Sequence, residues 1–167
     1  MILGMSLATF TTMHVIISLI AIVAGIIVIF GLLGSNRMPG MTAIFLLFTI
    51  LTSVTGFLFP FNGVTPGDII GALSLVLLAI ACIALYGMKL SGAWRWIYVV
   101  TAMVSLYFNV FVLVIQSFLK IPALHALAPG EPPGGPVFGV IQGIVLVFFV
   151  LVIIGAVRRF RPIATYA

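Results

Sequence analysis

The sequence predicts an all-α fold, an integral membrane helix bundle with about five transmembrane helices in one domain over residues 1–167. Composition is the first reason. Hydrophobic residues make up 64% of the chain and charged residues only 5%, whereas a soluble domain carries about 25% charged residues. The second reason is length, because the chain divides into apolar runs of about 20 residues, enough for a helix to cross a bilayer. Lipid is therefore the expected surrounding of this chain.

The first two spans are expected at residues 14–33 and 42–59. Small and polar residues share one face of the first span, and such residues let helices approach closely in lipid. We interpret this first run as a retained span and not as a signal peptide, because no basic segment precedes it. His14 is expected at the start of the span, at the level of the membrane interface. Pro60 is expected to stop the second helix.

The third span is expected at residues 69–88, with Thr65 or Asp68 as the cap of its N-terminus. Asp68 also suits the first turn, where the helix dipole favours negative charge. Cys82 is the single cysteine, so no intramolecular disulfide forms, and we interpret it as a small packing residue.

The fourth span is expected at residues 94–119 and carries a polar stripe on one helical face. The stripe consists of Thr101, Ser105, Asn109, Gln116 and Lys120. Polar side chains in a span face other protein or a wet cavity more often than lipid. Asn109 and Gln116 are expected to be the most buried of them.

The fifth span is expected at residues 137–157, after a proline-rich link in which residues 122–127 form one interfacial turn. Gly135, Gly139 and Gly143 recur every four residues and predict a close-packing face, with Gln142 beside it.

The basic residues predict the orientation of the bundle. With alternating spans, six of them fall on one side: Arg37, Lys89, Arg95, Arg158, Arg159 and Arg161. The other side holds Lys120, Asp68 and Glu131. Because Lys and Arg favour the cytoplasmic side, we expect the N-terminus outside and the C-terminus in the cytoplasm. The expected location is the bacterial inner membrane.

This orientation places six polar residues at similar depth in the outer half, as a candidate ligand-binding layer: His14, Thr55, Asn109, Gln116, Lys120 and Gln142. The alternative is purely structural, with hydrogen bonds between helices and a Lys120 that extends to the headgroups.

Several classes of chemistry lack their motifs. Haem held by two histidines would need His14 and His125, and His125 lies in the proline-rich link. The chain has one Asp and one Glu, and it lacks the HExxH and CxxC spacings that are typical of metal sites. No nucleophile and base pair or phosphate-binding loop is present, so we expect no enzyme, no cofactor and no metal. The net charge of +5 marks topology and not a nucleic-acid partner.

Three stretches resemble a group of small multi-pass bacterial inner-membrane proteins of unknown function. These are LTSVTGFLFPF at residues 51–61, GAWRWIYVVTA at 92–102 and LYFNVFVLVIQSFLKIPALHALAP at 106–129. The resemblance covers most of the chain and implies a membrane protein, with no activity attached.

Two functions of different class follow. The first is a structural or accessory membrane component, as a homo-oligomer or a subunit of a larger membrane complex. The second is a small transporter or ligand-binding protein that uses the polar layer. A weaker third hypothesis is a pH sensor built on His14 and His125, because imidazole titrates near neutral pH.

Overall fold

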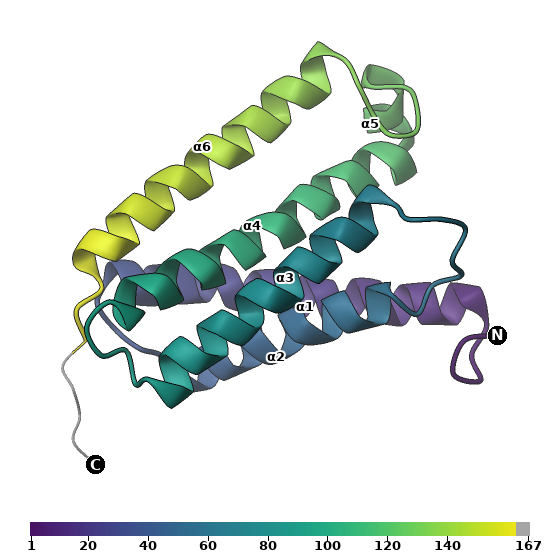
Figure 1. Cartoon of the computed structure of the whole chain (residues 1–167). Helices are drawn as coiled ribbons and strands as arrows, with labels where there is room; N and C mark the ends of the chain where they lie inside the picture. Colours follow the sequence, from purple (N-terminus) through teal and green to yellow (C-terminus); the bar gives the residue numbers. More distant parts are fainter. Residues whose placement is uncertain (163–167) are drawn as a thin grey trace.

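The computed structural model describes residues 1–162, which form long, roughly antiparallel helices (Figure 1). The elements are α1 (Leu7–Leu33), α2 (Pro39–Gly56), α3 (Pro66–Cys82) continued by the π-helix η1 (Ile83–Gly87), α4 (Trp94–Lys120), α5 (Pro122–Leu127) and α6 (Pro136–Arg159). Residues 1–162 contain no β-strand, and five of the helices are long and apolar enough to cross a membrane. The predicted all-α bundle is confirmed. The predicted cytoplasmic tail extends to residue 167, and its residues 163–167 lie outside the described part.

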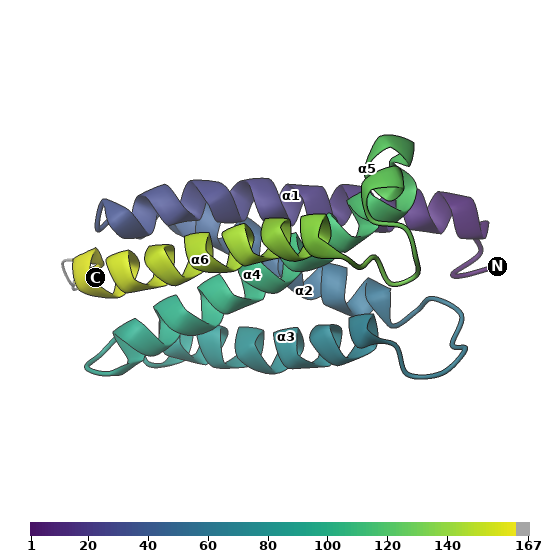
Figure 2. The ribbon, with the colours of Figure 1, turned by 90° about the horizontal axis from the view of Figure 1, so that it is seen from above.

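The fourth long helix is the centre of the bundle. Helix α4 contacts α1, α2, α3, α5 and α6. Seen from above, α4 and α6 lie between α1 on one side and α3 on the other (Figure 2). The α1–α2 loop, the α3–α4 loop and the end of α6 share one end of the molecule, which we call the basic end. The N-terminus, the α2–α3 loop and α5 share the opposite end, which we call the α5 end.

The first helix begins at Leu7, earlier than the predicted residue 14. The hydroxyl of Ser6 caps it by accepting a hydrogen bond from the Thr9 amide at 3.1 Å. The hydroxyls of Thr11 and Thr12 donate to carbonyls one turn earlier, at 2.8 and 3.0 Å. Both hydroxyl groups therefore find hydrogen-bond acceptors within the helix, and the residues before 14 are helical although the span was expected to begin at residue 14. His14 therefore lies about two turns inside α1 and not at its start.

The second helix occupies Pro39–Gly56 and is displaced by three residues at each end from the predicted 42–59. Pro39 suits the first turn, where its missing N–H is not needed. The helix ends before Pro60. The amides of residues 57–59 donate to carbonyls three residues earlier, in tighter turns than those of an α-helix. The residue before a proline favours an extended backbone, so the helix does not continue to Pro60.

The remaining boundaries follow the sequence closely. Thr65 and Asp68 form a capping box, in which the Thr65 hydroxyl accepts from the Asp68 amide at 3.2 Å and the Asp68 carboxylate accepts from the Thr65 amide at 2.8 Å. The fourth and fifth spans lie within two residues of expectation. The interfacial turn is present as α5. The π-helical turn η1 has no counterpart in the prediction.

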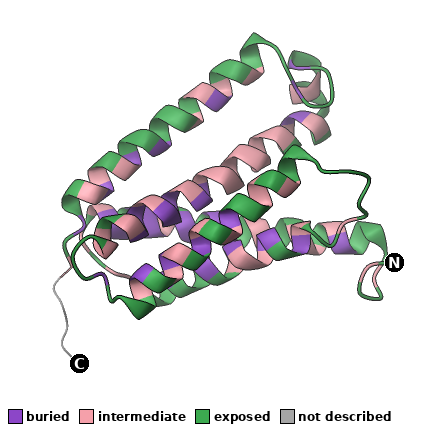
Figure 3. Cartoon of the chain, in the orientation of Figure 1, coloured by how far each residue is buried: buried purple, intermediate pink, exposed green. Residues whose placement is uncertain are grey.

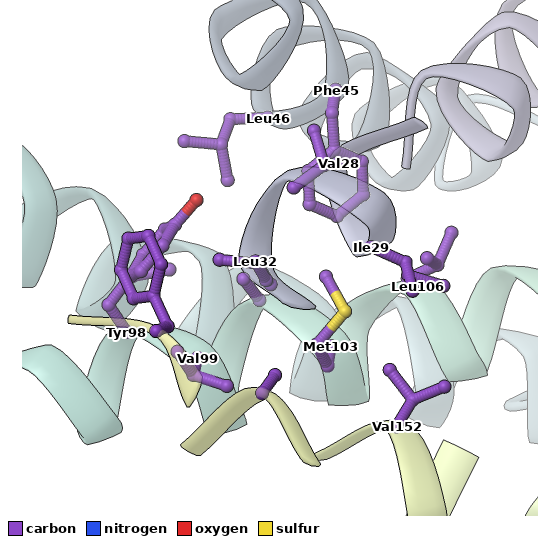
Figure 4. Close-up of a cluster of buried hydrophobic side chains, with 14 of the residues drawn as sticks. Val28, Ile29, Leu32, Phe45, Leu46, Tyr98, Val99, Met103, Leu106 and Val152 are labelled. Atoms are coloured by element: carbon purple, nitrogen blue, oxygen red, sulfur yellow. The ribbon is translucent and has the colours of Figure 1, made fainter. Parts of the chain in front are cut away.

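The buried core lies toward the basic end, where α4 meets α1, α2 and α6 (Figure 4). Gly25 of α1 lies where these helices approach closely. A Cβ atom at this position would lie 2.6 Å from Cδ1 of Leu106 and 3.0 Å from Cδ2 of Phe45. Both neighbours are fully buried, so the crossing of α1 over α4 and α2 depends on glycine.

Burial changes abruptly along α4. Between Tyr98 and Leu106 every residue except Val100 and Val104 is buried, whereas none from Tyr107 to Ser117 is (Figure 3). The bundle is thus closed toward the basic end and looser toward the α5 end. Every predicted site residue lies in this looser half.

Candidate functional site

His14 and Thr55 connect α1 to α2 near the α5 end. Nδ1 of His14 lies 2.7 Å from Oγ1 of Thr55. The same hydroxyl donates its one proton to the Leu51 carbonyl at 2.7 Å. The hydroxyl therefore accepts from the imidazole, which places the ring proton on Nδ1. The ring also packs edge-on against Phe59, with centroids 5.3 Å apart and planes at 88°. His14 is thus fixed in orientation by both helices.

Lys120 and Gln116 occupy the end of α4, and both are exposed. The positive charge of Lys120 lies within electrostatic range of His14. Asn109 and Gln116 were expected to be the most buried polar residues, and this was wrong, because Asn109 is only partly buried and Gln116 is exposed. The helical stripe identifies residues that share a face, but from Tyr107 to Ser117 no residue of α4 is fully covered by a neighbouring helix.

The inner part of the polar stripe is buried as predicted. The hydroxyl of Thr101 donates to the Ile97 carbonyl at 2.7 Å and that of Ser105 to the Thr101 carbonyl at 2.9 Å. Both bonds stay within α4, so these residues need no partner from another helix. Asn109 differs, because its Nδ2 atom is buried and has no hydrogen-bond partner. Such a donor is costly unless water or a ligand accepts from it.

Gln142 of α6 is buried and contacts a different side of α4. Its Nε2 atom donates to the Phe111 carbonyl at 3.1 Å, while its Oε1 atom is buried without a partner. On the same side, Tyr107 packs against Phe149 of α6, with centroids 5.7 Å apart. Asn109 is about 200° around the helix from both Tyr107 and Phe111. The structure therefore brings together His14 and Thr55 and sets Gln142 apart on the α6 side.

Arg95, which was interpreted as an interfacial anchor and orientation marker, has a further role that was not predicted. Its Nη1 atom donates to the carbonyls of Val157 and Phe160, at 2.8 and 2.7 Å. These are carbonyls at the C-terminus of α6 that lack partners within the helix. Arg95 thereby ties the start of α4 to the end of α6. Backbone carbonyls carry no residue signature, so only the structure identifies this contact.

Two shallow grooves, of ≈ 340 and ≈ 560 Å³, follow the outer surface of α1 and α2. Their walls are almost entirely apolar, with Thr9 and Thr12 as the exceptions. Neither groove includes a predicted site residue. Within residues 1–162, no three His, Cys, Asp or Glu side chains lie close enough to share a metal ion. Cys82 is partly buried and packs against the core.

No family model, curated protein or solved structure matches this chain. The resemblance to small multi-pass bacterial membrane proteins therefore stays a prediction.

Proposed function

We propose that this protein is a non-enzymatic structural or accessory membrane component that assembles through α6, with a second copy or within a larger membrane complex. The glycine face of α6, on which Gly139 is exposed and Gly143 half-buried, carries the proposal. The apolar window of α6 is 17% buried, the least of the five spans. A Cβ atom at Gly139 or Gly143 would meet nothing within 4 Å. The close-packing face expected from the sequence thus has no partner inside the described chain.

Glycines one turn apart make a shallow depression in which another helix backbone comes close, and van der Waals contact then favours association in lipid. Bulky side chains flank the depression, including Val140, Val147 and Val150, all exposed. A second copy related by two-fold symmetry would place the same glycines opposite each other.

Light scattering of the detergent-purified protein, with energy transfer between labelled copies in vesicles, tests the proposal. We expect the natural chain to associate and Gly143→Leu to separate it. Ala79→Leu is the matched control, because Ala79 is an exposed small residue on another span. A monomeric natural chain, or equal behaviour of the two variants, contradicts self-assembly through this face. Co-purification of another subunit with the natural chain and not with Gly143→Leu identifies a larger complex.

We further propose a bacterial inner-membrane location, with the N-terminus outside and the C-terminus in the cytoplasm. Six of the seven Lys and Arg residues lie at the basic end, and the positive-inside rule assigns that end to the cytoplasm. Single cysteines placed at Glu131 and Arg159 in a Cys82→Ala background test this with a maleimide that does not cross membranes. Intact cells should label position 131 and not 159.

A small ligand-binding protein or transporter is the second candidate, favoured by the unpartnered Nδ2 atom of Asn109. A ligand with an oxygen acceptor would satisfy this donor, on the helix face that also carries Gln116 and Lys120. Asn109→Leu and Gln116→Leu should then abolish ligand binding with little change in stability. Under the structural proposal these substitutions change stability alone.

A further inference from the structure

Three arginines come from segments that meet at one loop of the basic end. The backbone amide of Arg161 donates to the hydroxyl of Ser35 at 2.8 Å, although 126 residues separate them. Arg37 follows Ser35 by two residues. On α6, a Cβ at Gly155 would lie 3.2 Å from Leu33 of α1, and Arg159 lies one turn further along the same face. The side chains of Arg37, Arg159 and Arg161 are therefore within reach of a common point beside Ser35.

These guanidinium groups have no carboxylate near them among residues 1–162. The chain has only two acidic residues, Asp68 and Glu131. Both lie at the α5 end, and Asp68 is already bonded to Thr65. The Nε atom of Arg37 is buried and has no hydrogen-bond partner. Like charges held together without an anion repel one another, so an anion bound there would stabilise the loop.

The C-terminal dipole of α6 does not account for the cluster. That dipole is equivalent to roughly half an elementary charge, and Arg95 already donates to the terminal carbonyls of Val157 and Phe160. Three further cations exceed what the helix end attracts.

Aromatic residues indicate the depth of the cluster. Trp94 begins α4 at the same end, and Trp96 and Tyr86 are 46% and 57% exposed. Trp and Tyr concentrate at the level of lipid headgroups. The anion most available to guanidinium groups at that depth is a lipid phosphate, which arginine binds through paired hydrogen bonds.

We propose that Arg37, Arg159 and Arg161 form a binding site for the phosphate of one anionic phospholipid at the basic end. The proposal rests on the placement of the protein in a bilayer and is independent of assembly through α6. Bound lipid is counted per chain, so a monomeric protein with bound lipid would contradict the assembly proposal alone.

Native mass spectrometry of the full chain, titrated with phosphatidylglycerol or phosphatidylcholine, tests the site. We expect the natural chain to retain one phosphatidylglycerol and to prefer it over phosphatidylcholine. A basic group near an anionic surface accounts for about a fivefold change in affinity, so Arg37→Gln combined with Arg161→Gln should weaken retention about 30-fold. Lys89→Gln combined with Arg158→Gln is the matched control, because both are exposed cations at the same end and the pair loses the same total charge as the double variant. Its retention should stay within about twofold.

If the control and the double variant lost retention of phosphatidylglycerol equally, the lipid would be held by diffuse electrostatic attraction to the basic end. That result would overturn the proposed site. Should the double variant fail to fold, Arg159→Gln alters one exposed side chain and should still weaken retention about fivefold. Unchanged retention there overturns the site as well. Inorganic phosphate distinguishes the two sources of the anion. Millimolar phosphate that displaced the lipid completely would assign the site to a soluble phosphate and overturn the lipid.

Discussion

His14 of α1 donates its Nδ1 proton to the hydroxyl of Thr55 on α2, across 2.7 Å and 41 residues of sequence. It is a side-chain to side-chain hydrogen bond between two different helices. It orients the imidazole and holds α1 and α2 together in the looser half of the bundle.

Replacing Thr55 with valine should destabilise the protein by about 1 kcal/mol, the usual range for such bonds between membrane helices being about 0.6–2 kcal/mol. Valine keeps the shape and removes the acceptor, so the half-buried Nδ1–H loses its partner. Thr12→Val is the control, because the Thr12 hydroxyl bonds only within α1. Unfolding of the purified proteins in detergent measures both. Equal effects of the two substitutions would deny any special role for the His14–Thr55 bond.

Gly25→Ala should destabilise the bundle by about 1–3 kcal/mol, because the added methyl group overpacks a closed core. The nearest atom, Cδ1 of Leu106, would be only 2.6 Å away. Shortening that neighbour with Leu106→Val should recover part of the loss in the double variant. Gly40→Ala is the control, since a Cβ at Gly40 meets nothing. Thermal unfolding in detergent is the measurement, and a neutral Gly25→Ala would contradict the close approach.

Arg95→Gln should loosen the end of α6 at a cost of about 1 kcal/mol, at the low end for charged hydrogen bonds because the site is half-exposed. The carbonyls of Val157 and Phe160 would lose their donor. Limited trypsin digestion, followed by mass spectrometry, should show faster cleavage after Arg158 or Arg159. Lys89→Gln removes a nearby charge without touching α6 and should leave that rate unchanged. Protection of the tail in Arg95→Gln would refute the capping role.

Gln142→Met should be neutral or stabilising within about 0.5 kcal/mol if Gln142 is purely structural, because it removes a buried Oε1 atom that has no partner. Methionine has a similar length and fits irregular gaps. Gln142→Glu should destabilise strongly, since a buried carboxylate would face the Phe111 carbonyl. Unfolding of both variants is compared with the natural chain. A marked loss of stability in Gln142→Met would show that the Oε1 atom has an unidentified partner.

The number and rough position of the spans could be predicted because bilayer thickness fixes the length of an apolar helix. Local hydrogen bonding made the capping of α3 by Thr65 and Asp68 predictable too. The polar residues before His14 suggested that α1 begins later than it does. They are helical because the hydroxyls of Thr11 and Thr12 donate to carbonyls of their own helix.

The candidate site was predictable only in part, for a geometric reason. Periodicity shows which residues share a helical face, and it correctly placed Thr101 and Ser105 inside the bundle. It does not show which neighbour covers that face, so Gln116 proved exposed. Periodicity also does not show contacts between residues far apart in the sequence, such as the hydrogen bonds of Arg95 to the end of α6.

The tight half of α4 has a consequence for electrical insulation. Ala102, Met103 and Leu106 expose none of their surface, so a hydrated ion entering from either face would have to shed its water shell there. That step is costly in an apolar interior. Sealed liposomes should therefore hold a potassium gradient equally well with and without this protein.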